Sequence, residues 1–251
     1  MIINISKGLL MTVFLSVSWG QIPSGAALLD SMTTIMSPEN SKTIISQKVV
    51  KADGRSRTFE LEMYSTGKSD KVLIRYIRPS SVRGQSFLIL NDGDDIWTYS
   101  PRTRRVRKIA SHAKKQKLQD SDFSFGDFSS EDTWKEDYVT ENVGVEEVTG
   151  TICWKLRAVA KTDADVDYPT VILYIRKSDY YPVLIEYLDT QRRVEKSLRF
   201  RDIKTIDGYP TAIQFDMENH LEGTRTVMKM LEISYDWEPP KGFFSERNLK
   251  K

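Results

Sequence analysis

The chain is poor in the residues that cross-link small exported proteins or bind metals. Its 251 residues include one cysteine, Cys153, and two histidines, His112 and His220. A single cysteine excludes a framework of intramolecular disulfides, so the stability of the fold must come from a hydrophobic core. Neither histidine has a cysteine, histidine or glutamate at a spacing typical of zinc ligands. We therefore expect no cofactor and no metal site.

Catalytic signatures are missing as well. The sequence has no G-x-S-x-G nucleophile elbow and no glycine-rich phosphate loop. Residues 163–167 have the D-x-D-x-D spacing that opens an EF-hand loop, but Tyr168 and Tyr174 stand where that loop needs glycine and glutamate. The chain also lacks a strong excess of either charge, with 37 basic and 35 acidic residues, which argues against nucleic acid as a partner. These absences favour a binding protein over an enzyme.

A short apolar segment opens the chain. A basic residue precedes an apolar run over residues 8–19, and Ser18 and Gly20 are small residues at the spacing of a signal-peptidase site. The run is shorter than the roughly 20 residues that a membrane-spanning helix needs. We predict that residues 1–20 are a cleaved signal peptide, with Ala26 as a second candidate cleavage site. The alternative is a retained N-terminal anchor. Because no cysteine stands directly after the run, where lipidation would require it, we predict a periplasmic protein that is not lipidated.

The remaining residues, 21–251, contain no low-complexity linker and no internal repeat, which predicts a single domain. Residues 26–36 carry apolar side chains three and four apart, the pattern of an amphipathic helix, and this helix should end before Pro38. Beyond it, alternation of apolar and polar residues predominates. We therefore predict a mainly β protein with a few helices.

The alternation predicts about eleven strands. They are residues 59–64, 72–77, 87–90, 96–99, a strand in the basic stretch after Pro101, 152–160, 170–176, 182–188, 194–203, 211–219 and 226–235. An antiparallel sheet of this size does not remain flat, so it should curl into a barrel or an open half-barrel. Several strands have apolar residues on both faces, which indicates that part of the second face is also covered.

Four motifs follow one another in a fixed order. They are Trp97-x-Tyr99-x-Pro101, Ser121-Asp122-Phe123, Asp127-Phe128 with Glu131-Asp132, and the closing Phe244-Ser245-Glu246-Arg247. Together they resemble a bacterial family of outer-membrane lipoprotein-sorting proteins, relatives of the periplasmic carrier LolA, over residues 44–251. The family usually has glycine before S-D-F, where this chain has Asp120. The resemblance implies an open half-barrel whose concave apolar face is closed by helices and holds acyl chains.

The resemblance and the alternation together suggest which residues bind lipid. We expect Phe59 and Trp97 to border the cavity, because both lie on strands next to hairpin tips. The full set of candidates is Leu29, Met32, Phe59, Leu61, Met63, Ile74, Trp97, Tyr99 and Phe215. The loop from Ser121 to Trp134 mixes aromatic and polar residues, and we predict that it forms a movable lid together with the helix at 26–36.

A basic cluster follows the W-x-Y-x-P motif and consists of Arg102, Arg104, Arg105, Arg107 and Lys108. One interpretation is a solvated hairpin whose charges prevent unwanted pairing at a sheet edge. The other is transient docking on anionic lipid headgroups or on an acidic partner, where each basic residue contributes about 1 kcal/mol. The sequence leaves both interpretations open.

These observations lead to a functional hypothesis. We predict a monomeric periplasmic carrier or chaperone that binds lipid or lipoprotein acyl chains for sorting to the outer membrane. Its partners would be an inner-membrane exporter and an outer-membrane acceptor. The alternative is an envelope sensor or an accessory subunit of an inner-membrane lipid exporter, and an enzyme ranks third.

Overall fold

The computed structural model describes residues 22–109, 116–128, 132–164 and 166–251. The predicted signal peptide lies outside the described residues. The strands are β1 (Asn40–Val50), β2 (Ser56–Thr66), β3 (Lys71–Arg78), β4 (Ser86–Leu90), β5 (Asp95–Ser100), β6 (Arg105–Ile109), β7 (Tyr138–Val148), β8 (Thr151–Ala160), β9 (Thr170–Arg176), β10 (Pro182–Leu188), β11 (Val194–Ile206), β12 (Tyr209–Asn219) and β13 (Thr224–Ser234). The α-helices are α1 (Gly25–Met36) and α2 (Asp132–Asp137), and short 3-10 turns include η3 (Leu118–Asp120), η4 (Gly126–Phe128) and η5 (Asn248–Lys250).

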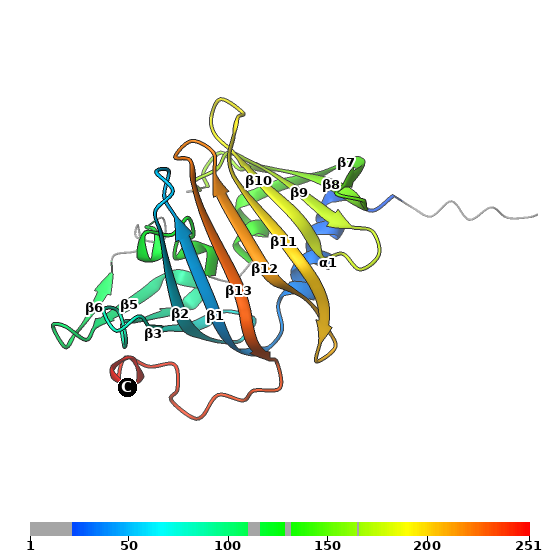
Figure 1. Ribbon diagram of the computed structural model, residues 1–251. Helices are drawn as coiled ribbons and strands as arrows, with labels where there is room; N and C mark the ends of the chain where they lie inside the picture. The colour runs from blue at the N-terminus through cyan, green and yellow to red at the C-terminus, as the bar shows by residue number, and fades with distance from the viewer. Residues whose placement is uncertain (1–21, 110–115, 129–131, 165) are drawn as a thin grey trace, which may run out of the picture.

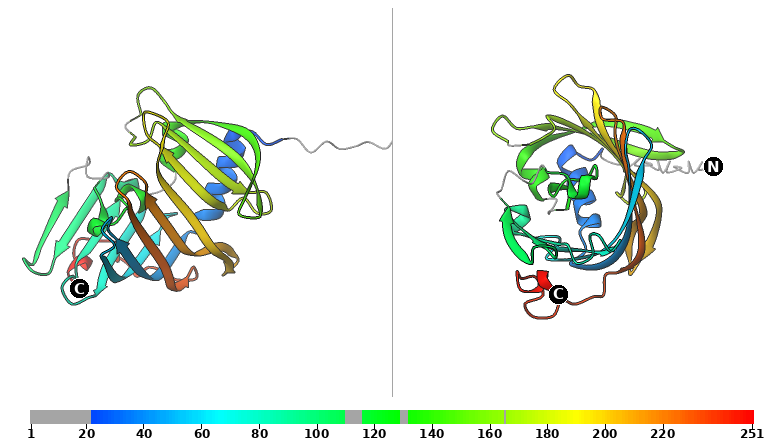
Figure 2. Two further views of the ribbon diagram at one scale, coloured as in Figure 1. Left: turned by 45° about the horizontal axis from the view of Figure 1, so that its top comes forward. Right: turned by 60° about the vertical axis from the view of Figure 1, so that its left-hand side comes forward.

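All thirteen strands belong to one antiparallel sheet with the order β6-β5-β4-β3-β2-β1-β13-β12-β11-β10-β9-β8-β7. The first and last strands, β1 and β13, pair with each other in the middle of the sheet, and β6 and β7 are its free edges. The sheet curls strongly without closing, and α1, η3, η4 and α2 lie inside the curve (Figures 1 and 2). The predicted open half-barrel is confirmed.

The alternation of apolar and polar residues did not predict two of the strands, β1 and β7. In β1 the inward-facing positions include Ser41, Thr43 and Gln47, all buried, so polar residues occupy the face that alternation expects to be apolar. In β7, which lies at an edge, Val139 and Val145 are exposed, so neither face has the usual polarity. A strand pattern read from hydrophobicity fails where the buried face is polar or the strand is hardly buried.

The helix α1 covers the concave face of the sheet. Ser24 caps its N-terminus by accepting a hydrogen bond from the Ala27 N–H at 3.2 Å. Leu28, Leu29 and Met32 form its buried stripe and join the main core, as the spacing of the apolar residues predicted. At Gly25 a Cβ atom would lie 2.5 Å from the Thr140 carbonyl oxygen of β7, so the close approach of helix and strand requires glycine.

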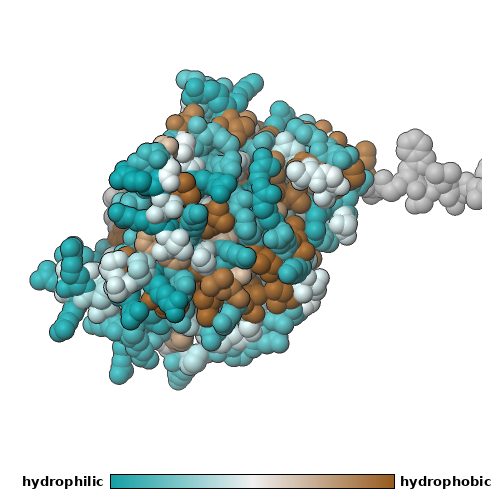
Figure 3. Space-filling view, in the orientation of Figure 1, coloured by the Kyte–Doolittle hydropathy of each residue, from teal (hydrophilic) through white to brown (hydrophobic). Residues whose placement is uncertain are grey.

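The C-terminal segment, residues 237–250, covers the convex face of β2 to β5. Its side chains Trp237, Phe244 and Leu249 belong to a second apolar cluster with Leu73 and Leu88. The prediction that part of the second face is covered is therefore confirmed. Elsewhere on the convex side, hydrophilic side chains predominate and apolar ones gather in smaller areas between them (Figure 3).

Candidate functional site

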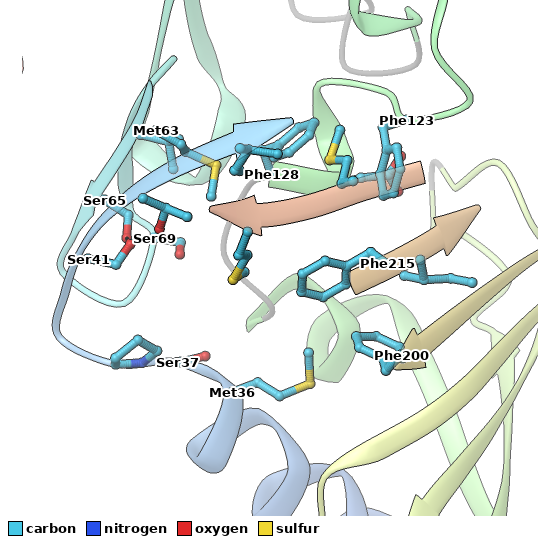
Figure 4. Close-up of a pocket in the computed structure, with 18 of the residues that line it drawn as sticks. Met36, Ser37, Ser41, Met63, Ser65, Ser69, Phe123, Phe128, Phe200 and Phe215 are labelled. Carbon is cyan, nitrogen blue, oxygen red and sulfur yellow. Dashed lines mark hydrogen bonds between the residues drawn. The ribbon is translucent and has the colours of Figure 1, made fainter. Parts of the chain in front are cut away.

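A cavity of about 300 Å³ lies between the concave face of the sheet, α1 and the segment from η3 to α2. Its apolar wall comprises Met32, Met36, Ile45, Met63, Val72, Phe123, Phe128, Trp134, Ile185, Tyr187, Leu198, Phe200, Phe215, Met228, Met230 and Ile233. Figure 4 shows side chains from the helix, the sheet and the covering loop converging on the same space. The volume is at the lower end of the range of small-molecule pockets, about 300–1,000 Å³.

Methionine is concentrated around this cavity. Of the six methionines in the described residues, five line it: Met32, Met36, Met63, Met228 and Met230. The unbranched, polarizable thioether side chain adapts to differently shaped apolar partners, and methionine is favoured at promiscuous binding surfaces. The cavity wall can therefore adjust to its contents.

Aromatic rings contribute to the cavity wall both from the sheet and from the covering loop. Phe200 of β11 and Phe215 of β12 pack edge to face with ring centroids 5.5 Å apart, and Phe123 and Phe128 of the covering loop lie 5.9 Å apart. Tyr235 also lines the cavity, and burial raises the pKa of its phenol, so this side chain is neutral at physiological pH. The rings and the neutral phenol therefore add apolar surface to the wall.

The S-D-F motif fixes the covering loop to the start of β13. The buried Asp122 carboxylate accepts hydrogen bonds from the hydroxyls of Thr224 and Thr226, and its N–H donates to Thr226 Oγ1 at 2.9 Å. Phe123 and Phe125, which follow, are buried in the concave core. Asp120 has a φ of 58°, a left-handed conformation that glycine adopts without steric cost.

The structure places seven of the nine predicted lipid-binding residues on the concave side. Met32, Met63 and Phe215 line the cavity itself. The others are buried in the concave core behind the lining residues: Leu29, Phe59, Leu61 and Ile74.

The expected position of Trp97 and Tyr99 is corrected. Both belong to the convex cluster under the C-terminal segment, and neither lines the cavity. Their neighbour Ile96 is buried in the concave core, so alternation along β5 points Trp97 and Tyr99 outward. The aromatic W-x-Y motif therefore serves the packing of the convex face.

Several lining residues were missed by sequence reasoning, most clearly Met36, Phe200, Met228 and Met230. Met228 and Met230 lie two apart on β13, so alternation was sufficient to place them on one face. The uneven distribution of methionine was the signal that would have selected that face as the cavity wall.

The predicted basic cluster occupies the β5–β6 hairpin at a free edge of the sheet. Its five side chains are exposed, and Lys108 forms an ion pair with Asp95 across the hairpin. Ile109 packs into the concave core, so alternation places Arg105 and Arg107 on the same inner side of β6. The hairpin thus presents positive charge along the rim of the open half-barrel.

In the described part of the chain, no helix is long and apolar enough to cross a membrane. The same residues contain no group of three or more histidine, cysteine, aspartate or glutamate side chains arranged to hold a metal ion. Cys153 is buried, and burial raises the pKa of its thiol, which keeps it in the unreactive protonated form.

The model of a family of uncharacterized proteins matches residues 68–251, well over half of the chain. The chain belongs to this family. A structure with the same architecture is that of a DUF1329 family protein from Desulfovibrio piger, at 27% identity and a TM-score of 0.82, covering 90% of this chain and 97% of the other. No curated protein matched the chain.

Two further structures support the resemblance seen in the sequence motifs. A putative outer membrane lipoprotein-sorting protein domain from Vibrio parahaemolyticus has 24% identity and a TM-score of 0.79, with 89% of this chain and 97% of that chain covered. A LolA superfamily protein from Nitrosomonas europaea has 20% identity and a TM-score of 0.73, with 90% and 100% covered. The predicted LolA-like fold is thereby confirmed.

Proposed function

We propose that this protein is a carrier that holds the acyl chains of a lipid or lipoprotein in the concave cavity during transfer across the bacterial envelope. The observation that carries the proposal is the methionine-lined cavity under a separate cover. A fixed enzyme pocket needs side chains with well-defined positions, whereas a carrier gains from a wall that adapts to chains of different length.

The energetics of transfer favour such a wall. Removing a sixteen-carbon chain from water gains about 12 kcal/mol, at about 0.8 kcal/mol per methylene, but a bilayer offers nearly the same gain. A carrier must match the membrane closely enough to take up the chain and still release it. An apolar wall of flexible side chains gives the hydrophobic gain without the additional affinity of a unique fit.

The carrier would act in the periplasm after cleavage of the predicted signal peptide. It would receive its cargo from an inner-membrane exporter and deliver it to an outer-membrane acceptor, acting as a monomer and without catalysis. The LolA-like fold supports a role of this kind, since the Vibrio relative is described as a lipoprotein-sorting domain.

Cavity filling tests the proposal directly. Met230 lines the cavity on β13, and the next residue, Leu231, is half exposed and lies outside the lining. We expect Met230→Trp to abolish binding of a fluorescent fatty acid and to remove acyl chains from the lipid extract of the purified protein, measured by mass spectrometry. Leu231→Trp is the matched control and should behave as the parent protein.

The comparison separates loss of binding from loss of folding, provided that thermal unfolding is recorded for both variants. A parent protein that yields no acyl chains and binds no fatty acid would contradict the carrier function. So would a folded Met230→Trp variant that binds as well as Leu231→Trp.

A further inference from the structure

One end of the cavity is polar. Ser37 from the segment after α1, Ser41 of β1, Ser65 of β2 and Ser69 of the β2–β3 turn lie together on the side opposite Phe200 and Phe215 (Figure 4). The Lys68 N–H donates to the Glu39 carbonyl oxygen at 3.4 Å, which holds the turn against the start of β1. The cavity therefore has an apolar part and a hydroxyl-lined end.

The hydroxyls at this end have spare hydrogen-bonding capacity. Thr43 is 1% exposed and lines the cavity, and its Oγ1 has no hydrogen-bond partner in the described structure. The buried hydroxyls of Ser41 and Ser65 bond to each other at 2.7 Å, which uses one of their two protons and leaves the other available. Buried polar groups are nearly always paired, so an unpaired hydroxyl on a residue of the cavity wall indicates a missing partner.

Lys68 adds positive charge at the mouth of the same end. Its side chain is exposed, lines the cavity, and forms no ion pair with any described residue. Among the described residues, the other charged side chain of the lining is Asp127 of η4, whose Oδ2 accepts hydrogen bonds from the N–H and the hydroxyl of Ser124. The uncommitted charge at the hydroxyl-lined end is thus positive.

We infer that the hydroxyl-lined end binds the anionic head of an acyl-chain amphiphile, with Thr43 donating a hydrogen bond to a head-group oxygen and Lys68 neutralising its charge. The chain then extends between the methionines toward Phe200 and Phe215. This inference rests on the proposed carrier function and adds the orientation and the chemical class of the ligand. Carboxylate and phosphate share the required chemistry, namely an oxygen acceptor with negative charge.

The probe is 11-(dansylamino)undecanoic acid, whose dye and carboxylate lie at opposite ends, together with its methyl ester as the uncharged partner. We expect the parent protein to bind the acid about ten times more tightly than the ester at low salt. Lys68→Gln should reduce this preference to about two-fold while leaving ester affinity unchanged. Lys71→Gln is the matched control, since Lys71 lies three residues away, pairs with Asp70 and does not line the cavity.

Thr43→Val tests the hydroxyl independently, because valine keeps the shape and removes the donor. We expect acid affinity to fall about five-fold, since a hydrogen bond to an ionised acceptor is lost. The melting temperature of the empty protein should stay constant or rise, because an unpaired buried hydroxyl has been removed. A purely structural role for Thr43 would lower the melting temperature and leave the preference for acid over ester intact.

Competition against the dansyl acid identifies the head group. Palmitate and a lysophosphatidate of equal chain length carry carboxylate and phosphate, and hexadecanol is the neutral reference. Stronger displacement by either anion than by hexadecanol supports the inference and selects the head. Equal displacement by all three, or equal affinity for acid and ester in every variant, overturns the inference but leaves the carrier function standing. If neither probe binds, the carrier function itself fails.

Discussion

The same strands, β2 to β5, are packed in different ways on their two faces. On the convex face, Tyr64 packs against Trp237 and Phe243 with ring centroids 5.1 and 4.9 Å apart, and the cluster contains no methionine among the described residues. On the concave face, Phe59, Tyr76 and Phe87 also pack against one another, but Met63 of β2 joins methionines of α1 and β13 around a cavity of about 300 Å³. One sheet thus carries a methionine-free cluster on its convex face and a methionine-lined cavity on its concave face. The C-terminal segment and α1 lie on opposite faces of the sheet (Figure 2).

The covers of the two faces are also held differently. The C-terminal segment is bonded to the strands beneath it, since Arg75 donates to the Asn248 carbonyl oxygen at 2.8 Å and Ser86 to the Leu249 carbonyl oxygen at 2.6 Å. The buried stripe of α1 packs on the concave core through apolar side chains such as Leu28 and Met32. Its polar anchors lie away from that stripe: Asn142 donates to the Pro23 carbonyl oxygen, and Lys135 pairs with Asp30. Directional bonds fix a cover in one position, whereas apolar contacts tolerate sliding. The comparison indicates that the C-terminal segment is fixed on the convex face, whereas α1 rests on the larger concave core mainly through apolar contacts and is the cover that can respond to a ligand.

The largest effect on stability should come from the convex cluster. Leu88 is fully buried between β4 and the C-terminal segment. We expect Leu88→Ala to lower the free energy of unfolding by about 3 kcal/mol, measured by urea denaturation, because it loses buried area and leaves a void. Fatty-acid affinity of the folded fraction should not change.

The concave counterpart is Met63→Ala, which enlarges the cavity at a half-buried position. We expect a smaller loss of stability and a clear change in affinity. The distinction between the faces fails if Leu88→Ala alters affinity as strongly as Met63→Ala.

A somewhat smaller effect is expected at the anchor of the covering loop. Asp122→Ala removes the acceptor for Thr224 and Thr226 and should cost about 2 kcal/mol, since hydrogen bonds to a charged group are lost. Hydrogen exchange should accelerate over residues 116–128 and remain unchanged in the C-terminal segment. Asp120→Gly is the control and should be neutral or slightly stabilising, because glycine adopts the left-handed φ of 58° at no steric cost. Equal exchange in Asp122→Ala and the parent would show that the loop is held by its phenylalanines alone.

Sequence reasoning succeeded where local periodicity determines the structure. The spacing of Leu28, Leu29 and Met32 was sufficient to place α1, and the alternation of Phe59, Leu61 and Met63 was sufficient to place β2. Both patterns depend only on neighbouring residues in one element.

It failed where the outcome depends on distant segments. Alternation assigns Trp97 and Ile96 to opposite faces, but which face is concave depends on where α1 and residues 237–250 pack. The loop position depends on Asp122 meeting Thr226, 104 residues away. Alternation did not predict β1, because polar residues such as Thr43 face inward there. Thr43 lines the hydroxyl-lined end of the cavity, where a polar side chain is found in place of an apolar core residue. Local patterns carry no record of these contacts.

The next test asks how α1, the covering loop and the C-terminal segment respond to a ligand. The expected effect is a change in hydrogen-exchange rates. On binding of a fatty acid, α1 and residues 116–128 should gain hydrogen-exchange protection, since the ligand adds contacts to both. The strands from Thr170 to Leu188 and the C-terminal segment should stay unchanged. Uniform exchange, with and without ligand, would contradict the predicted movable lid while leaving binding itself unaffected.

The smallest effect on stability, and a large one on membrane association, is expected at the basic hairpin. Replacing Arg104, Arg105 and Arg107 by serine changes exposed side chains at the rim of the half-barrel, so the free energy of unfolding should shift by less than about 0.5 kcal/mol. If the rim docks on membranes, each lost arginine removes about 1 kcal/mol of attraction to anionic lipid. Sedimentation with phosphatidylglycerol vesicles should then fall sharply at low salt. The difference from the parent protein should shrink as the screening length approaches about 8 Å at physiological ionic strength.

The matched control replaces Lys48, Arg225 and Lys229, which are exposed on the central strands β1 and β13, by serine. Both triple variants lose the same net charge, so a selective loss of binding in the hairpin variant isolates the position of the charge from its amount. Equal sedimentation of the two variants would favour the other interpretation, in which the arginines on β6 only keep a free strand edge from pairing with other chains. That interpretation makes its own prediction, because the hairpin variant should then associate or aggregate through β6 at high protein concentration. Docking at the rim would place the concave cavity, and not the aromatic convex face, next to the membrane from which an acyl chain is taken.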